Sequence, residues 1–148
     1  MSELPLRRDV VPGSGPFVHP ENAGFWESLT EGQLRLQQCS ECGTVRFPIA
    51  PTCWKCLAPA HEWREIDGNG TVAAAIRIER ATGNAVWQEA TPYFTGLVDT
   101  VAGIRLPGRI LCRCGEGARM GSPVRVVRIP TKSEYSTYAF EHECEENC

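Results

Sequence analysis

Two pairs of cysteines constrain this chain more than any other feature of its sequence. Cys39 and Cys42 form one C-x-x-C pair, Cys53 and Cys56 form the second, and ten residues separate the two pairs. Each pair places two thiols on one tight turn, and Gly43 after the first pair accepts positive φ without cost. Two such turns supply the four sulfur ligands of a tetrahedral structural zinc site, with Zn–S distances of about 2.3 Å.

This predicted metal site has consequences for the chemistry of the chain. Four protein ligands leave no coordination position for water, so the metal is expected to stabilise the fold and not to catalyse. Iron in a rubredoxin-like site would use the same thiolates, and the spacing does not separate the two metals. Zinc is favoured because structural ribbons inside cells use it, and the sequence predicts one zinc per chain.

The remaining four cysteines have no comparable spacing. We interpret them as free thiols, two on a strand and two in a tail, with a second metal site as the alternative; they are Cys112, Cys114, Cys144 and Cys148. The N-terminus shows no secretory cleavage pattern, which argues against disulfides. No apolar run approaches the roughly 20 residues of a membrane helix. We therefore expect a soluble, cytoplasmic protein.

Turn signals and hydrophobic alternation predict a mainly β chain in four parts. Residues 1–32 read as a proline- and glycine-rich arm followed by a short helix over 21–32, with Asn22 as N-cap and Gly32 as the stop. Residues 33–67 hold the cysteine pairs between short strands. Residues 68–133 contain four or five short strands with glycine-rich turns, which suggests a small closed barrel with the OB-fold as the candidate. Residues 134–148 are predicted to form an acidic tail.

Charge is distributed unevenly behind the net value of −3. Five glutamates lie in 134–148, so the rest of the chain, with 15 basic and 13 acidic residues, carries about +2. Thirteen of the 15 basic residues are arginine, and six of these lie between 105 and 128. Arginine suits bidentate recognition of phosphate or carboxylate. The alternative is a solvated strand face with ordinary ion pairs.

The order of motifs resembles a known family. The run FWESLTEGQLRLQQCSECGTVRFPIAPTCWKC is followed by EWREIDGNGTV, TPYFTGLVDT, IRLPGRI and MGSPVRVV. Over about residues 22–130 this is similar to the zinc-ribbon-plus-OB-fold proteins associated with acyl-CoA enzymes. The resemblance implies an N-terminal helix, a four-Cys zinc ribbon and an OB-fold. It also implies a small subunit or fused domain beside thiolase-like enzymes or retro-aldolases, including the zinc-finger partner of a benzylsuccinyl-CoA-type thiolase in toluene degradation.

Site residues follow partly from this resemblance. The four cysteines of the two C-x-x-C pairs match the family's metal ligands. Phe25 and Trp26 match its aromatic helix, whose role is core packing or contact with a partner subunit. Coenzyme A carries phosphates that arginine can grip, and the candidates for a shared CoA-ester ligand are Arg105, Arg109, Arg125 and Arg128. The acidic tail matches nothing in the family.

The leading hypothesis is a non-catalytic zinc-binding subunit of an acyl-CoA thiolase-type complex, acting as scaffold and helping to bind the CoA ester. A nucleic-acid-binding module is the alternative, because zinc ribbons and OB-folds both serve that role. The net negative charge and the presence of only two lysines argue against it.

A stand-alone enzyme is the third reading. The three histidines, His19, His61 and His142, have no catalytic motif around them. Neither a G-x-S-x-G elbow nor a P-loop is present. The sequence therefore favours chemistry supplied by a partner.

Overall fold

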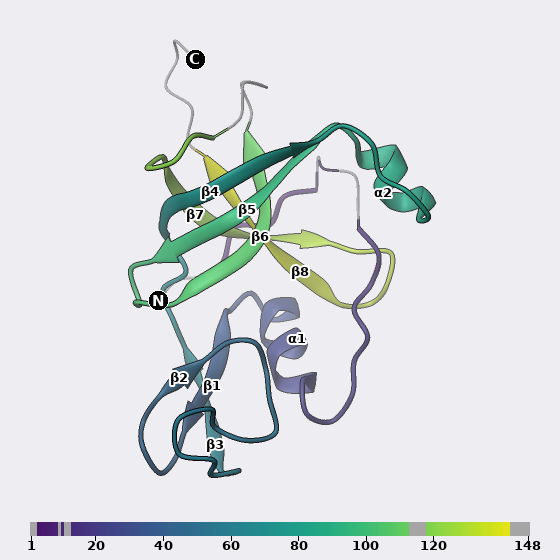
Figure 1. The fold of residues 1–148 in the computed structure, drawn as a ribbon. Coiled ribbons are helices and arrows are strands. Elements are labelled where there is room, and N and C mark those ends of the chain that lie inside the picture. The colour runs from purple at the N-terminus through teal and green to yellow at the C-terminus, as the bar shows by residue number, and fades with distance from the viewer. Residues whose placement is uncertain (1–2, 9, 11–12, 113–117, 143–148) are drawn as a thin grey trace.

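The computed structural model describes residues 3–8, 10, 13–112 and 118–142. A three-stranded ribbon and a five-stranded barrel lie at opposite ends of the molecule, with helix α1 between them (Figure 1). The elements in chain order are α1 (Ala23–Thr30), β1 (Arg35–Cys39), β2 (Val45–Arg46), β3 (His61–Glu65), β4 (Gly70–Ile78), α2 (Ala85–Ala90), β5 (Tyr93–Thr100), β6 (Arg105–Cys112), β7 (Pro123–Pro130) and β8 (Ser136–His142).

Helix α1 confirms the predicted helix with tighter bounds. Asn22 occupies the N-cap position, but its side chain makes no cap bond; it accepts from the His19 N–H and donates to the Phe17 carbonyl. Gly32, at φ +92°, ends the helix by donating its N–H to the carbonyl of Leu29. Neither α1 nor α2, the helices within the described ranges, is long and apolar enough to cross a membrane.

The ribbon sheet has the strand order β2-β1-β3, with both pairings antiparallel. Strand β3 was not predicted, because its five residues carry charge at several positions and alternate only weakly. A buried hydrogen-bond network ties the ribbon to the segment that follows β2. Gln37 is 1% exposed, and its side-chain oxygen accepts from Arg46 Nε at 3.1 Å and from the Ala50 N–H at 2.9 Å.

The barrel closes in the order β4-β5-β6-β8-β7 and confirms the predicted OB-fold. All neighbouring strands are antiparallel except β6 and β8, which run parallel. Strands β4 and β7 pair only at Gly70 with Val124 and Thr71 with Pro123. The pairing ends there because Pro123 is the first residue of β7, and a register shift between Val72 and Ala74 lies in the β4–β5 pairing.

The start of the predicted acidic tail belongs to the barrel. Strand β8 pairs with both β6 and β7, so the expected boundary at residue 133 falls before the last barrel strand. The glutamates suggested solvent exposure, but Phe140 is fully buried and Glu141 is only 3% exposed. Alternation within β8 was the better signal. Residues 143–148, including Cys144 and Cys148, lie outside the described residues.

The N-terminal arm is extended, as its prolines and glycines predicted. Leu6 pairs in parallel with Arg128, and Gly13 pairs in parallel with Thr131. The Arg7 N–H donates to the Arg128 carbonyl, and the Arg128 N–H donates to the Pro5 carbonyl, both at 2.9 Å. The arm therefore occupies a stretch of the β7 edge that β4 leaves unpaired.

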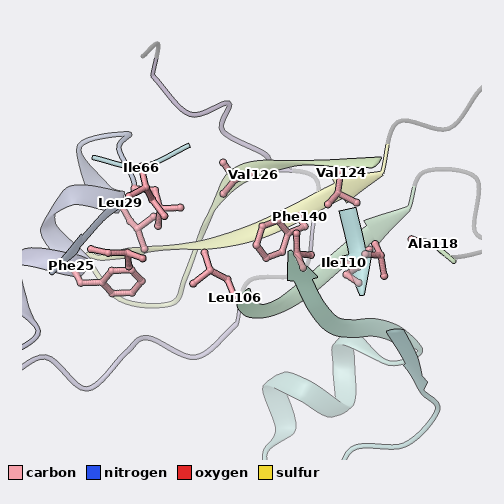
Figure 2. Close-up of a cluster of buried hydrophobic side chains, with 13 residues drawn as sticks. Phe25, Leu29, Ile66, Leu106, Ile110, Ala118, Val124, Val126 and Phe140 are labelled. Atoms are coloured by element: carbon pink, nitrogen blue, oxygen red, sulfur yellow. The ribbon is translucent and has the colours of Figure 1, made fainter. Parts of the chain in front are cut away.

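One large hydrophobic cluster runs from α1 through the barrel (Figure 2), and a smaller one is formed by Val127, Ile129 and Ala139. Phe25 and Leu29 lie at one end, Leu106 and Phe140 in the middle, and Val124 at the other end. Leu34 and Leu36 join the same cluster from the ribbon side. Burial of one large side chain contributes about 1.5–3 kcal/mol, so this shared core holds helix, ribbon and barrel together.

Candidate metal centre and adjacent cavities

The structure brings the four predicted cysteine ligands together. All four sulfurs lie within 4.8 Å of one another. The Sγ–Sγ distance is 3.5 Å between Cys39 and Cys56 and 3.6 Å between Cys42 and Cys53. A tetrahedron with Zn–S bonds of about 2.3 Å has edges of roughly 3.8 Å. The sulfurs therefore already have the spacing of a tetrahedral zinc site.

Both cysteine turns are built in the same way. The Gly43 N–H donates to the carbonyl of Cys39 at 3.0 Å, and the Leu57 N–H donates to that of Cys53 at 2.9 Å. Gly43 has φ +76° and Leu57 has φ +65°. Gly43 was predicted to take this conformation, but Leu57 was not, since the left-handed region costs a leucine about 1–2 kcal/mol. A metal that holds both turns would offset that cost.

The pKa values of the thiols in this cluster are shifted in opposite directions. Hydrogen bonds from the side chain and the backbone of Thr44 lower the pKa of Cys42 to about 6. At Cys56 the Ala58 N–H lowers the pKa, but the neighbouring thiols, Cys39 first, and burial raise it to about 12. Four thiolates at this spacing repel one another, and a divalent cation bound between them would neutralise that repulsion. The donor set fits Zn²⁺ on these grounds.

The two aromatic residues of α1, Phe25 and Trp26, differ in burial. Phe25 is 3% exposed and makes edge-to-face contacts with Trp26 at 4.8 Å and Tyr138 at 6.1 Å between ring centroids. The Phe25 ring therefore packs inside this chain, whereas Trp26 is half-buried.

Sequence reasoning missed two apolar side chains on the second cysteine turn, Trp54 and Leu57, which are 70% and 73% exposed.

Two cavities open beside the barrel. The first, which we call the aromatic cavity, has a volume of about 460 Å³ and lies where α1, the segment after β2, α2, β6 and β8 meet. The second, the arginine cavity, has a volume of about 380 Å³ and includes Arg7, Arg77, Tyr93 and Arg109 in its lining. Arg109 lines both cavities.

The four arginines predicted to bind CoA are not brought together. Arg105 forms a two-bond pair with Asp99 at 2.7 and 3.0 Å, and this pairing lowers the pKa of Asp99. Arg125 bonds Glu141. Arg128 donates to the Thr30 carbonyl and to Glu3. These partners were not predicted from the sequence, because most of them lie on other elements of the fold.

Of these four arginines, Arg109 is the one that lines the aromatic and arginine cavities. Its guanidinium carbon lies 5.4 Å from the centroid of the Tyr93 ring, a cation–π arrangement. Burial lowers the pKa of Arg109, which still leaves it charged at neutral pH. A partly desolvated cation of this kind binds an anion more strongly than a solvated one.

A sulfur–imidazole contact lies at the end of β6 and β8. Cys112 and His142 are register partners in the parallel pair, with 4.0 Å between Sγ and Nδ1. This contact was not predicted, because the parallel pairing of β6 with β8 was not predicted either. Cys114, the neighbour of Cys112 in the predicted second set, lies outside the described residues.

Comparison with known protein families matches both parts of the chain. Residues 26–62 match the model of the ChsH2 rubredoxin-like zinc ribbon domain, and residues 63–128 match that of the ChsH2 C-terminal OB-fold domain. The chain belongs to the ChsH2 family. Together the two ChsH2 models span the ribbon and most of the barrel, in the order that the resemblance predicted.

Individual relatives agree with the ChsH2 assignment. A probable enoyl-CoA hydratase alpha subunit from Thermomonospora curvata is 28% identical over 109 residues, which is 74% of this chain. The match covers 33% of that relative, so the chain spans about a third of its length. The ChsH2 family is associated with enzymes that process acyl-CoA.

Two solved structures show the same fold. An Ltp2-ChsH2(DUF35) aldolase matches with a TM-score of 0.75 and 24% identity, over 86% of this chain and 98% of that one. A DUF35-family protein of unknown function from Sulfolobus solfataricus matches with a TM-score of 0.58 and 16% identity, over 85% and 87% of the two chains.

Proposed function

We propose that this chain is a zinc-stabilised accessory subunit of a complex that acts on acyl-CoA thioesters, while a thiolase-like catalytic partner supplies the reacting groups. The observation that carries the proposal is the sealed four-thiol cluster within a chain of the ChsH2 family. Zinc held by Cys39, Cys42, Cys53 and Cys56 has no open position for water or substrate. Its role is to fix the ribbon.

The partner in this proposal is supported by the relatives. One is named as an alpha subunit, and another is described as an aldolase made of two components. The chain itself is short, and most of its buried apolar residues form a core shared by helix, ribbon and barrel. A role in organising a larger assembly follows from this combination.

The CoA part of the proposal rests on the arginine cavity. Arg77 on β4 and Arg109 on β6 both line it, and Tyr93 on β5, the strand between them, lines it as well. Arg77 pairs with Glu79 in an exposed contact at 3.0 Å, and exposed pairs of this kind contribute little. A CoA phosphate can therefore replace Glu79 on Arg77 while also reaching Arg109. Arg105, Arg125 and Arg128 do not line this cavity and are left out of this assignment.

Purification of the tagged chain from its native host tests the assembly. We expect a stoichiometric catalytic subunit to co-purify, about one zinc per chain, and activity on a CoA thioester in the purified complex. A chain that elutes alone under gentle conditions, with all thioester activity in separate fractions, would contradict the proposal.

Arginine variants in that complex test the CoA assignment. Arg77→Gln and Arg109→Gln should each raise the KM for the CoA thioester about tenfold, the loss of one charge-assisted hydrogen bond. Arg105→Gln is the matched control on the same strand as Arg109 and should leave KM unchanged. If all three variants had the KM of the unmodified complex, the arginine cavity would not bind the CoA thioester.

A further inference from the structure

We infer that Cys112 is a reactive thiol, assisted by His142, that forms a mixed disulfide with low-molecular-weight disulfides. This inference goes beyond the proposed function, because it concerns a modification of the chain itself and not the chemistry of a thioester. The reaction needs no catalytic subunit and can be measured on the isolated chain.

The strand ladder of the barrel brings the sulfur and the imidazole together. Cys112 is the last residue of β6, and His142 is the last residue of β8. They are register partners in the parallel pairing of these strands, and Sγ lies 4.0 Å from Nδ1. A catalytic hydrogen bond is often long before the reaction and shortens during it. The pair therefore has the arrangement of a nucleophile beside its base.

The face that carries this pair is the face that packs the barrel core. Ile110 and Phe140, two residues earlier on each strand, are also register partners and are 2% and 0% exposed. Side chains two residues apart in a strand point to the same face. Cys112 and His142 thus continue the core row to the end of the barrel, where both are half-buried. The thiol is held by the sheet and is still within reach of a small molecule.

Cys112 also lines the arginine cavity, which gives a small molecule room beside the sulfur. The volume of about 380 Å³ is in the range of small-molecule sites, roughly 300–1,000 Å³. A folded protein that carries a disulfide does not fit into such a volume. The class of reagent is therefore the disulfide of a small thiol, such as glutathione or cysteine.

The charged side chains around this cavity have other contacts. Arg7 pairs with Glu141 at 2.7 Å, and Arg77 pairs with Glu79 at 3.0 Å. Arg109 lies over the ring of Tyr93. We therefore assign the assistance to His142, which is in contact with the sulfur, and not to an arginine.

The reaction is an exchange between a thiol and a disulfide. His142 accepts the Cys112 proton at Nδ1, and the thiolate attacks one sulfur of the small disulfide. The bond between the two small-molecule sulfurs breaks as the bond to Cys112 forms. The second sulfur leaves as a thiolate and takes the proton from the imidazolium. Cys112 is oxidised and the leaving thiol is reduced, so the exchange needs no other oxidant.

Exchange with 4,4′-dithiodipyridine, which releases a coloured thiopyridone, measures this reactivity. A zinc-loaded chain with Cys114→Ser, Cys144→Ser and Cys148→Ser keeps Cys112 as its one thiol outside the metal cluster. We expect one thiopyridone per chain before any zinc is released. Adding His142→Asn should lower the second-order rate constant at pH 7 about tenfold, because an ordinary cysteine is only a few per cent thiolate at that pH.

Two controls separate assistance by His142 from a structural role. At about pH 10 an ordinary thiol is ionised without a base, so the rate constants with and without His142→Asn should converge there. His19→Asn removes an exposed histidine of the arm and should leave the rate constant unchanged at both pH values. Retained zinc and an unchanged circular dichroism spectrum verify that each variant is folded.

Mass spectrometry then identifies the modified residue in the chain with all its cysteines. After incubation of the zinc-loaded chain with glutathione disulfide, trypsin releases residues 110–113 as a peptide in which Cys112 is the one cysteine. We expect this peptide to carry one glutathione, and dithiothreitol to remove it.

Three kinetic results would overturn the inference: no reaction of Cys112 in the folded chain, an unchanged rate constant at pH 7 in His142→Asn, or the same loss of rate in that variant at pH 7 and pH 10. A disulfide between Cys112 and another cysteine of the chain, in place of the glutathione adduct, would equally overturn it. Failure here leaves co-purification with a catalytic subunit unaffected, so it is distinguishable from failure of the proposed function.

Discussion

Glu141 carries a charge within a buried part of β8 and depends on residues far away in the chain. Arg7 donates to its two carboxylate oxygens at 2.8 and 2.7 Å, and Arg125 donates to one of them at 2.9 and 2.8 Å. These bonds, that from Arg7 first, lower the pKa of Glu141 to about 2 from an ordinary value of 4.5. The ion pair fastens the N-terminal arm to the barrel.

The pH dependence of stability follows from this shift. Because the folded-state pKa lies below the unfolded one, the contribution of Glu141 is complete above about pH 4.5 and is lost as the pH falls toward 2. The shift corresponds to at most about 3 kcal/mol. Glu141→Gln should lower the free energy of unfolding at pH 7 by about that amount, since two guanidinium groups lose their acceptor.

Urea unfolding of the unmodified chain and of Glu141→Gln between pH 7 and pH 2 measures this effect as a difference. The free energies of unfolding of the unmodified chain and of Glu141→Gln should converge as the pH falls. Asp99→Asn, which removes the acceptor of an exposed pair, is the control and should leave stability nearly unchanged. A constant difference across this pH range would contradict the assigned role of Glu141.

At the residue scale, the sequence predicted what depends on neighbours in the chain. The cysteine ligands were found because a C-x-x-C turn is local, and Gly43 fits that turn. The partners of the arginines were not found, because the Glu141 pair with Arg7 spans 134 positions. The aromatic cavity was missed for the same reason, since its rings come from separate segments.

At the element scale, the ribbon and the barrel are stabilised by different means. The ribbon sheet is small, and its second turn contains Leu57 at positive φ. Zinc bound by four thiolates contributes roughly 10–16 kcal/mol in peptide models. The barrel, in contrast, closes through five strands around buried apolar side chains.

Removing the metal should therefore destabilise the ribbon and leave the barrel folded. With a chelator, or in Cys53→Ser, amide hydrogen exchange should show loss of protection in β1–β3, while β5 and β6 stay protected. Cys112→Ser is the matched control and should keep both the zinc and the protection of the ribbon. Equal loss of protection in ribbon and barrel would show that zinc stabilises the whole chain and not the ribbon.

The elements that were predicted correctly have strong local signals. Helix α1 lies between Asn22 and Gly32, and most barrel strands follow apolar alternation bounded by glycine turns. Strand β3 and helix α2 are five and six residues long, too short for a clear periodicity. Strand β8 was assigned to the acidic tail because the glutamates there suggested solvent exposure, although the ion-pair partners of Glu141 are supplied by the arm and β7.

At the scale of the whole molecule, the chain combines a sealed metal site with two cavities that share Arg109. The metal fixes the ribbon, the ribbon fixes one wall of the aromatic cavity, and the barrel supplies the other. None of these parts activates a nucleophile or water in the proposed mechanism. The chain would position a thioester for groups that belong to a partner.

Thioester turnover by the purified chain, compared with turnover by the complex isolated from its native host, tests this claim most directly. The account predicts no measurable cleavage by the zinc-loaded chain alone and full activity in the complex. Turnover by the chain alone at an ordinary enzymatic rate, about 1–10³ s⁻¹, would contradict it.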